Sequence, residues 1–145
     1  MTAAAALLAL LAGFAGSVQV AVMGRFGGRV GVLAALAFAT GVQLLFAVVL
    51  LLAVRRGAGI GAAFRAPPWM WAAGLMGLLV VFSITFAQPR IGATTTIGIL
   101  IAGQLAMGVL IDRFGLFGVD AVALTWTRIA GVVLLSAGAA LTLSR

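Results

Sequence analysis

The chain contains no cysteine and no histidine, and it also lacks glutamate, lysine and tyrosine. Without thiol groups, disulfides, thiolate metal sites and thiol nucleophiles are excluded. The remaining ionisable side chains are two Asp and nine Arg, which leave almost no repertoire for acid–base catalysis. These absences predict that the protein is not an enzyme and has no catalytic residues, no metal site and no cofactor.

Charge is also scarce, since 8% of the residues are charged against 65% hydrophobic, and the mean hydropathy is +1.33. Such values lie outside the usual range of soluble domains and indicate a polytopic membrane protein. The net charge of +7 comes from Arg residues that stand one to three at a time between apolar runs. A nucleic-acid surface would need them clustered on one soluble face. They are therefore interpreted as topology and headgroup anchors, and no nucleic-acid partner is expected.

The clearest membrane span is Ile91–Ile111, a charge-free run that ends at Asp112-Arg113. Its 21 residues, at about 1.5 Å each, reach the roughly 30 Å thickness of a bilayer core. Four similar segments predict an all-α fold, a bundle of five transmembrane helices in one domain over residues 1–145. The expected spans are about 2–22, 30–54, 69–88, 91–111 and 126–143. A cleaved signal peptide competes for the first segment, but its start lacks the basic residues typical of such peptides, so a retained span is expected.

Neutral polar side chains inside the spans are the candidate functional residues, because they cost less in the bilayer than charges but still need partners. Gln104, Gly108 and Asp112 share one helix face at steps of four residues, and Thr85 and Gln88 share a face of the preceding span. One interpretation is that these faces line a cavity; the other is that each amide binds a neighbouring helix. The predicted substrate-binding residues are Gln104, Gln88, Thr85, Ser83 and Gln19.

Two other polar features have simpler interpretations. Thr94–Thr96 near a helix start is typical of hydroxyls that bond to the preceding turn. Asp112 is the one acidic residue near the core, and a helix-end charge paired with Arg113 or Arg90 is favoured over a coupling role. Small residues such as those of Gly74/Gly77 and Ala102/Ala106 are expected to allow close helix packing.

Several motifs together resemble a known family. They are Gly92–Thr96 after Pro89-Arg90, the run Ala102-Gly103-Gln104-Leu105, the segment Leu110–Gly115, and Arg128 before a Gly-rich last helix. This pattern is similar to the short five-helix YdcZ-like branch of the drug/metabolite transporter superfamily. The resemblance implies a half-sized transporter that pairs and moves small metabolites, drugs or organic cations. The related small multidrug-resistance branch relies on a Glu in its first helix, and this chain has none, so neutral or weakly polar substrates, or coupling by another ion, fit better.

The distribution of Arg also predicts how the chain inserts. With five spans, one side of the membrane carries Arg55, Arg56, Arg65, Arg113 and Arg128, and the other carries Arg25, Arg29, Arg90 and Arg145. Because excess positive charge sets orientation, this near balance allows insertion both ways. Two opposed copies would form the inverted repeats of alternating-access transporters. We therefore expect an antiparallel homodimer in the bacterial inner membrane; a parallel dimer, or pairing with an oppositely oriented paralogue, is the alternative.

The predicted function is transport of an unidentified small molecule by alternating access at the dimer interface, within the lipid bilayer. Two alternatives remain open on the sequence. One is a small dual-topology ion channel, which the run Thr94–Thr96 suggests. The other is an accessory membrane subunit without transport.

Overall fold

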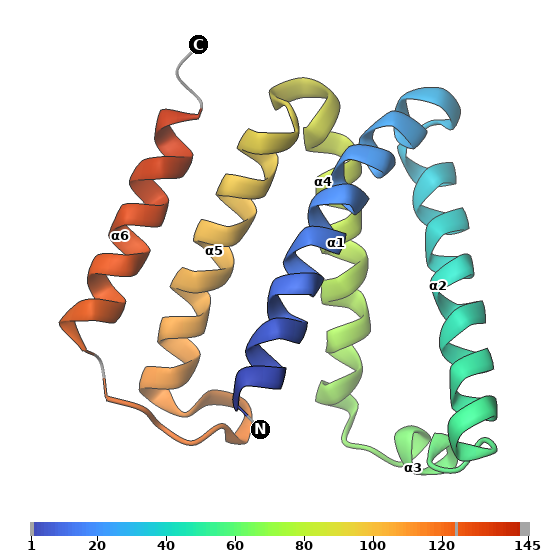
Figure 1. Cartoon of the computed structure of the whole chain (residues 1–145). Coiled ribbons are helices and arrows are strands. Elements are labelled where there is room, and N and C mark those ends of the chain that lie inside the picture. The colour runs from blue at the N-terminus through green and yellow to red at the C-terminus, as the bar shows by residue number, and fades with distance from the viewer. Residues whose placement is uncertain (1, 124, 143–145) are drawn as a thin grey trace. The chain divides into compact units, whose positions relative to one another are not determined.

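In the computed structural model, which describes residues 2–123 and 125–142, every regular element is a helix (Figure 1). Four helices are long and apolar enough to cross a bilayer: α1 (Thr2–Val30), α2 (Val32–Arg55), α4 (Ala72–Ile91) and α5 (Ala93–Phe114). The all-α prediction and the presence of several spans are confirmed for these residues. The five-span count and the dimer stay predictions.

The last helix, α6 (Trp126–Leu141), is apolar but has 16 residues. At a rise of about 1.5 Å per residue it measures about 24 Å, a little less than the roughly 30 Å hydrocarbon core. The predicted end of this span at residue 143 lies outside the described residues.

Three short elements lie in the connections between the long helices. α3 (Ile60–Phe64) and the 3₁₀ turn η1 (Pro68–Trp71) follow α2, and the 3₁₀ turn η2 (Leu116–Gly118) follows α5. Pro68 stands at the start of η1, where the missing N–H of proline costs no helical hydrogen bond.

The first helix is longer than predicted, because the Gly- and Arg-rich segment 23–29 was expected to be a connection and is helical instead. α1 continues to Val30, and Gly31 alone joins it to α2. Gly31 adopts φ 88° and ψ 151°, a backbone conformation that is essentially restricted to glycine. The turn is also supported by the rings of Phe26 and Phe38, whose centroids lie 5.6 Å apart in an edge-to-face arrangement.

The same kind of junction joins α4 to α5. Pro89 and Arg90 were expected to close the third span, but Pro89 lies inside α4, which continues to Ile91. Proline removes one hydrogen bond from the last turn, where a membrane helix tolerates it. The chain then turns at Gly92, with φ 82° and ψ 162°.

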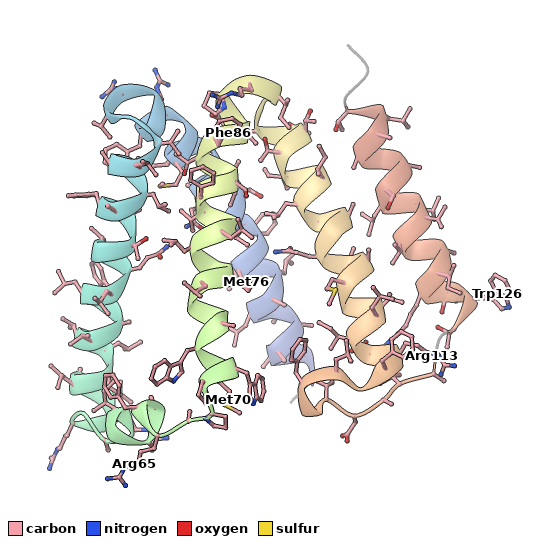
Figure 2. The ribbon with its side chains drawn as sticks, turned by 180° about the vertical axis from the view of Figure 1, so that it is seen from behind. Arg65, Met70, Met76, Phe86, Arg113 and Trp126 are labelled. Carbon is pink, nitrogen blue, oxygen red and sulfur yellow. The ribbon has the colours of Figure 1, made fainter. Side chains whose placement is uncertain are left out.

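The described chain divides into two compact units, one made of Ala21–Pro89 and the other of the remaining residues. Few side chains are buried, and most large apolar side chains are exposed. Figure 2 shows one example, Trp126, which points away from α6 and is 84% exposed. Such exposure is ordinary where lipid tails surround the helices, since they are as apolar as the side chains.

Candidate functional site

A groove with a volume of about 550 Å³ runs between α5 and α6. Its apolar walls come from both helices at steps of three and four residues, as expected for one face of each helix. Three polar side chains interrupt these walls: Gln104 and Asp112 from α5, and Arg128 from α6. The other lining residues are Ile101, Leu105, Gly108, Val109, Gly131, Val132 and Leu135.

The two walls of the groove are joined near the start of α5. Gly98 faces α6 so closely that an added Cβ would lie 3.3 Å from the Cβ of Ala139, the kind of close approach that small residues allow in membranes. Thr95 is buried, and its hydroxyl donates a 2.9 Å hydrogen bond to the carbonyl of Thr142. The contact and the hydrogen bond hold the N-terminal end of α5 against the C-terminal end of α6.

The opposite end of the groove carries an ion pair between Asp112 and Arg128. The guanidinium Nη1 of Arg128 donates to the carboxylate Oδ2 of Asp112 at 2.7 Å. The Arg128 side chain is 43% exposed and the Asp112 side chain 37%. The backbone carbonyl of Asp112 also accepts a 2.7 Å hydrogen bond from the N–H of Val122. Asp112 therefore anchors both α6 and the loop that leads to it.

This pairing corrects the sequence-based assignment of a partner. Asp112 was expected to pair with Arg113 or Arg90, and the structure gives Arg128 instead. Arg113 is adjacent in the chain, and adjacent residues of a helix point in different directions. Arg128 comes within reach because the connection after α5 brings the start of α6 beside the end of α5.

Gln104 lies in the middle of the same face, eight residues before Asp112 with Gly108 between them, and all three line the groove. The predicted alignment of these three residues is thus confirmed. Gln104 is exposed, so its amide stands free to hydrogen-bond with water or a solute in the groove. An amide in an otherwise apolar span is costly unless it has such a partner.

Thr85 and Gln88, which were also predicted to line a cavity, instead pack against glycines of α1. Thr85 is fully buried, and its hydroxyl donates to the carbonyl of Val81 at 2.7 Å. A Cβ added at Gly27 would lie 2.5 Å from the Thr85 methyl group, and one at Gly24 would overlap the Gln88 side chain. This pair of contacts is a helix-packing site within the unit Ala21–Pro89.

The two other predicted residues lie apart from the groove. Ser83 is exposed on α4, and Gln19 is half-buried on α1. Of the five predicted binding residues, Gln104 is the one that lines the groove between α5 and α6 in the described chain. A role in binding stays a prediction for all five.

Two hydroxyls of the threonine run after Gly92 donate hydrogen bonds to backbone carbonyls. Thr96 is buried, and its hydroxyl donates to the carbonyl of Gly92 at 2.7 Å, which confirms the predicted bond to the preceding turn. Thr95 makes a different bond, to Thr142. Because both hydroxyls are used in this way, the run gives no support to the channel alternative.

Sequence reasoning missed Arg128 as a groove residue and Gly24, Gly27 and Gly98 as contact glycines. At the glycines that it did select, Gly74 and Gly77, an added Cβ would meet no atom within 4 Å. A small residue shows where a close contact is possible, but the sequence alone does not say which helix fills the space.

Comparison with known proteins adds a family. The model of the family described as "Putative inner membrane exporter, YdcZ" matches residues 4–141. The inner membrane protein YdcZ of Escherichia coli (strain K12) is 39% identical over 77 residues, which are 53% of this chain. The chain spans about half the length of this curated relative, 51%. No solved structure matches the chain.

Proposed function

The chain belongs to the YdcZ family of the drug/metabolite transporters, and on that premise we propose that it moves a small molecule across the membrane by alternating access. It is a multi-pass inner membrane protein. The observation that carries the proposal is the groove between α5 and α6, which combines apolar walls with the amide of Gln104 and the pair Asp112–Arg128. Binding sites for small molecules have this composition, mostly apolar with a few fixed polar groups.

The charges of the groove favour a neutral or weakly polar substrate. Among the described residues that line the groove, Asp112 is the one carboxylate, and Arg128 already neutralises it at 2.7 Å. An organic cation would have to displace this Arg before it could use the carboxylate. A solute with an apolar body and a hydrogen-bonding group that meets Gln104 needs no such exchange.

The proposal includes α6 as the fifth span. Its 16 residues are apolar, and it is joined to α5 through Gly98 and Thr95. A helix slightly shorter than the bilayer core is accommodated by local thinning of the membrane at modest cost. With five spans, the N- and C-terminal ends of the chain lie on opposite sides.

The proposal further includes an antiparallel homodimer, with alternating access at its interface. Five Arg on one side against four on the other is too small a difference to set one orientation. Two opposed copies supply the inverted repeat that alternating access uses. Arg145, one of the four, lies outside the described residues.

Transport is tested with purified protein in proteoliposomes. A thermal-shift screen of neutral and weakly polar solutes first selects candidates, and uptake of each is then measured against concentration. The proposal expects saturable uptake at low turnover. Rapid ion flux without saturation would instead identify a channel, and neither kind of flux across the screen would identify an accessory subunit.

Orientation is tested separately, by fusing to the C-terminus a reporter that is active on one side of the membrane only. Dual insertion expects signal from reporters for both sides. Signal from one side alone overturns dual insertion and leaves a parallel dimer or a paralogue pair.

A further inference from the structure

One interval, 61 residues, recurs between matching positions of the two halves of the chain. It separates Arg29 from Arg90 and the junction residue Gly31 from Gly92. It also separates Gln43-Leu44 in α2 from Gln104-Leu105 in α5. Further identical pairs at this interval include Ala12/Ala73, Gly13/Gly74, Gly16/Gly77 and Val20/Val81 between α1 and α4, and Val48/Val109 between α2 and α5.

The backbone repeats with the sequence. Gly31 and Gly92 have nearly the same dihedral angles, φ 88° and ψ 151° against φ 82° and ψ 162°. The carbonyl of each glycine accepts a hydrogen bond from the first turn of the next helix. Gly31 accepts from the N–H of Ala35 at 3.0 Å, and Gly92 from the N–H of Thr96 at 3.1 Å. Ala35 and Thr96 are again 61 residues apart, and both are buried. Each glycine thus joins two long helices in succession, α1 to α2 and α4 to α5, and each joined pair is called a hairpin.

The contacts between the repeats are reciprocal. At the interval of 61, Gly24 corresponds to Thr85 and Gly27 corresponds to Gln88. In the structure Gly24 packs against Gln88, and Gly27 packs against Thr85. Each glycine of α1 thus contacts the residue of α4 that corresponds to the other glycine. Such an exchange of partners is typical of two elements related by a two-fold axis. Buried Met23 and Ile84 are a further corresponding pair beside this contact.

The repeat has a fixed sense in the membrane. α1 and α2 each have the length of one span, so α4 begins on the side where α1 begins. Counting spans along the chain, the two hairpins therefore cross the membrane in the same directions, which makes this a parallel and not an inverted repeat. In the part of the chain that the structure describes, α6 has no counterpart in the first half, where α2 is followed by the short helix α3.

We propose that the chain consists of two copies of one helical hairpin, and that Gln43 is the functional counterpart of Gln104 as a water-facing amide of the solute pathway. Both residues follow their junction glycine by 12 positions, about 18 Å along the helix, near the middle of a span. Gln43 is exposed on the highly apolar α2. An amide cannot hydrogen-bond to lipid tails, so an exposed one at this depth requires water, solute or another protein group. The inference rests on the proposed function, which assigns the groove at Gln104 to the solute.

The absence of cysteine makes the inference directly testable. Single-cysteine variants Gln43→Cys and Gln104→Cys are reconstituted in proteoliposomes and treated with a small water-soluble methanethiosulfonate. Leu45→Cys and Ala106→Cys are the matched controls, because they correspond at the interval of 61 and are exposed outside the groove. Each lies two residues from its Gln, on the opposite helix face.

We expect Gln43→Cys and Gln104→Cys to react at similar rates, on the order of tenfold faster than their controls, because the apolar lipid around the control positions suppresses the reactive thiolate. Reaction of Gln104→Cys while Gln43→Cys stays as slow as Leu45→Cys overturns the inference and leaves the proposed function standing. Slow reaction of both overturns the inference and removes the groove from the proposed function as well. Folding of each variant is checked by its elution from a sizing column.

Discussion

Gly24 of α1 lies directly against the side chain of Gln88 in α4, so close that a methyl group at position 24 would overlap the carboxamide. Gln88 thus occupies space that a glycine leaves open, and the helices approach more closely there than larger residues allow. The glycine lowers the intrinsic stability of α1, and the contact with α4 offsets this loss.

We predict that Gly24→Ala destabilises the protein by about 1–3 kcal/mol, the usual cost of overpacking a close contact. The free energy of unfolding is measured by titrating dodecyl sulfate into mixed micelles. Gly28→Ala is the control, since its Cβ would meet no atom within 4 Å, and alanine favours a helix over glycine by about 1 kcal/mol. The double variant Gly24→Ala/Gln88→Ala should recover part of the lost stability, because it removes the overlapping carboxamide but keeps the Cβ of residue 88, 2.8 Å from the added methyl group. Equal effects of Gly24→Ala and Gly28→Ala would contradict the contact.

A second prediction concerns the junctions between helices. Gly31→Ala and Gly92→Ala should each cost about 1–3 kcal/mol, because their dihedral angles are essentially open to glycine alone. Gly41→Ala, within α2 and with free space around it, should leave stability unchanged or raise it. The same micelle titration measures all three variants. If both junction variants matched Gly41→Ala, the strained turns would be excluded.

A third prediction concerns the ion pair of the groove. Asp112→Asn should leave dimer fraction and most uptake intact, because a partly exposed pair contributes only about 0–1 kcal/mol and Asn keeps an oxygen that can accept from Arg128. Uptake in proteoliposomes and dimer fraction in mild detergent are measured for the same preparation. Complete loss of uptake with normal assembly would instead make Asp112 a coupling residue.

A fourth prediction separates binding from packing at Gln104. Gln104→Ala should abolish saturable uptake, because it removes the amide that is proposed to meet the solute. The proposed dimer should persist, because even a hydrogen bond between helices contributes only about 1 kcal/mol. Ser136→Ala removes an exposed polar group of α6 that does not line the groove, so it should transport normally. A Gln104→Ala protein whose dimer dissociates, but whose remaining dimers still transport, would assign this amide to helix packing.

The sequence was sufficient to predict the long helices, because uninterrupted apolar runs leave a chain in lipid no alternative to helical hydrogen bonding. The predicted end of the first helix was wrong, because Gly24 and Arg25 are typical of a turn in soluble proteins. In lipid the same need for backbone hydrogen bonds favours continuation of the helix. Pro89 was misjudged likewise, since a missing hydrogen bond in the last turn does not end a membrane helix.

The site was harder to predict because polarity does not distinguish a groove from a contact. Gln104 and Gln88 have the same side chain, yet Gln104 lines the groove and Gln88 fills the space beside Gly24. The difference depends on which helix lies opposite each residue. The pairing of Asp112 with Arg128 likewise depends on the path of the loop between them, which follows from tertiary contacts such as Asp112 with Val122.

The single-residue junction at Gly31 has a mechanical consequence. A loop of several residues would let α1 and α2 tilt independently, whereas here only the two torsions of one glycine separate the last turn of α1 from the first turn of α2. A change in the tilt of α1 must therefore rotate α2 with it or be absorbed by those two torsions. The Gly31 junction therefore couples the tilt of α2 to that of α1, and a substitution that restricts or frees its torsions changes the strength of this coupling.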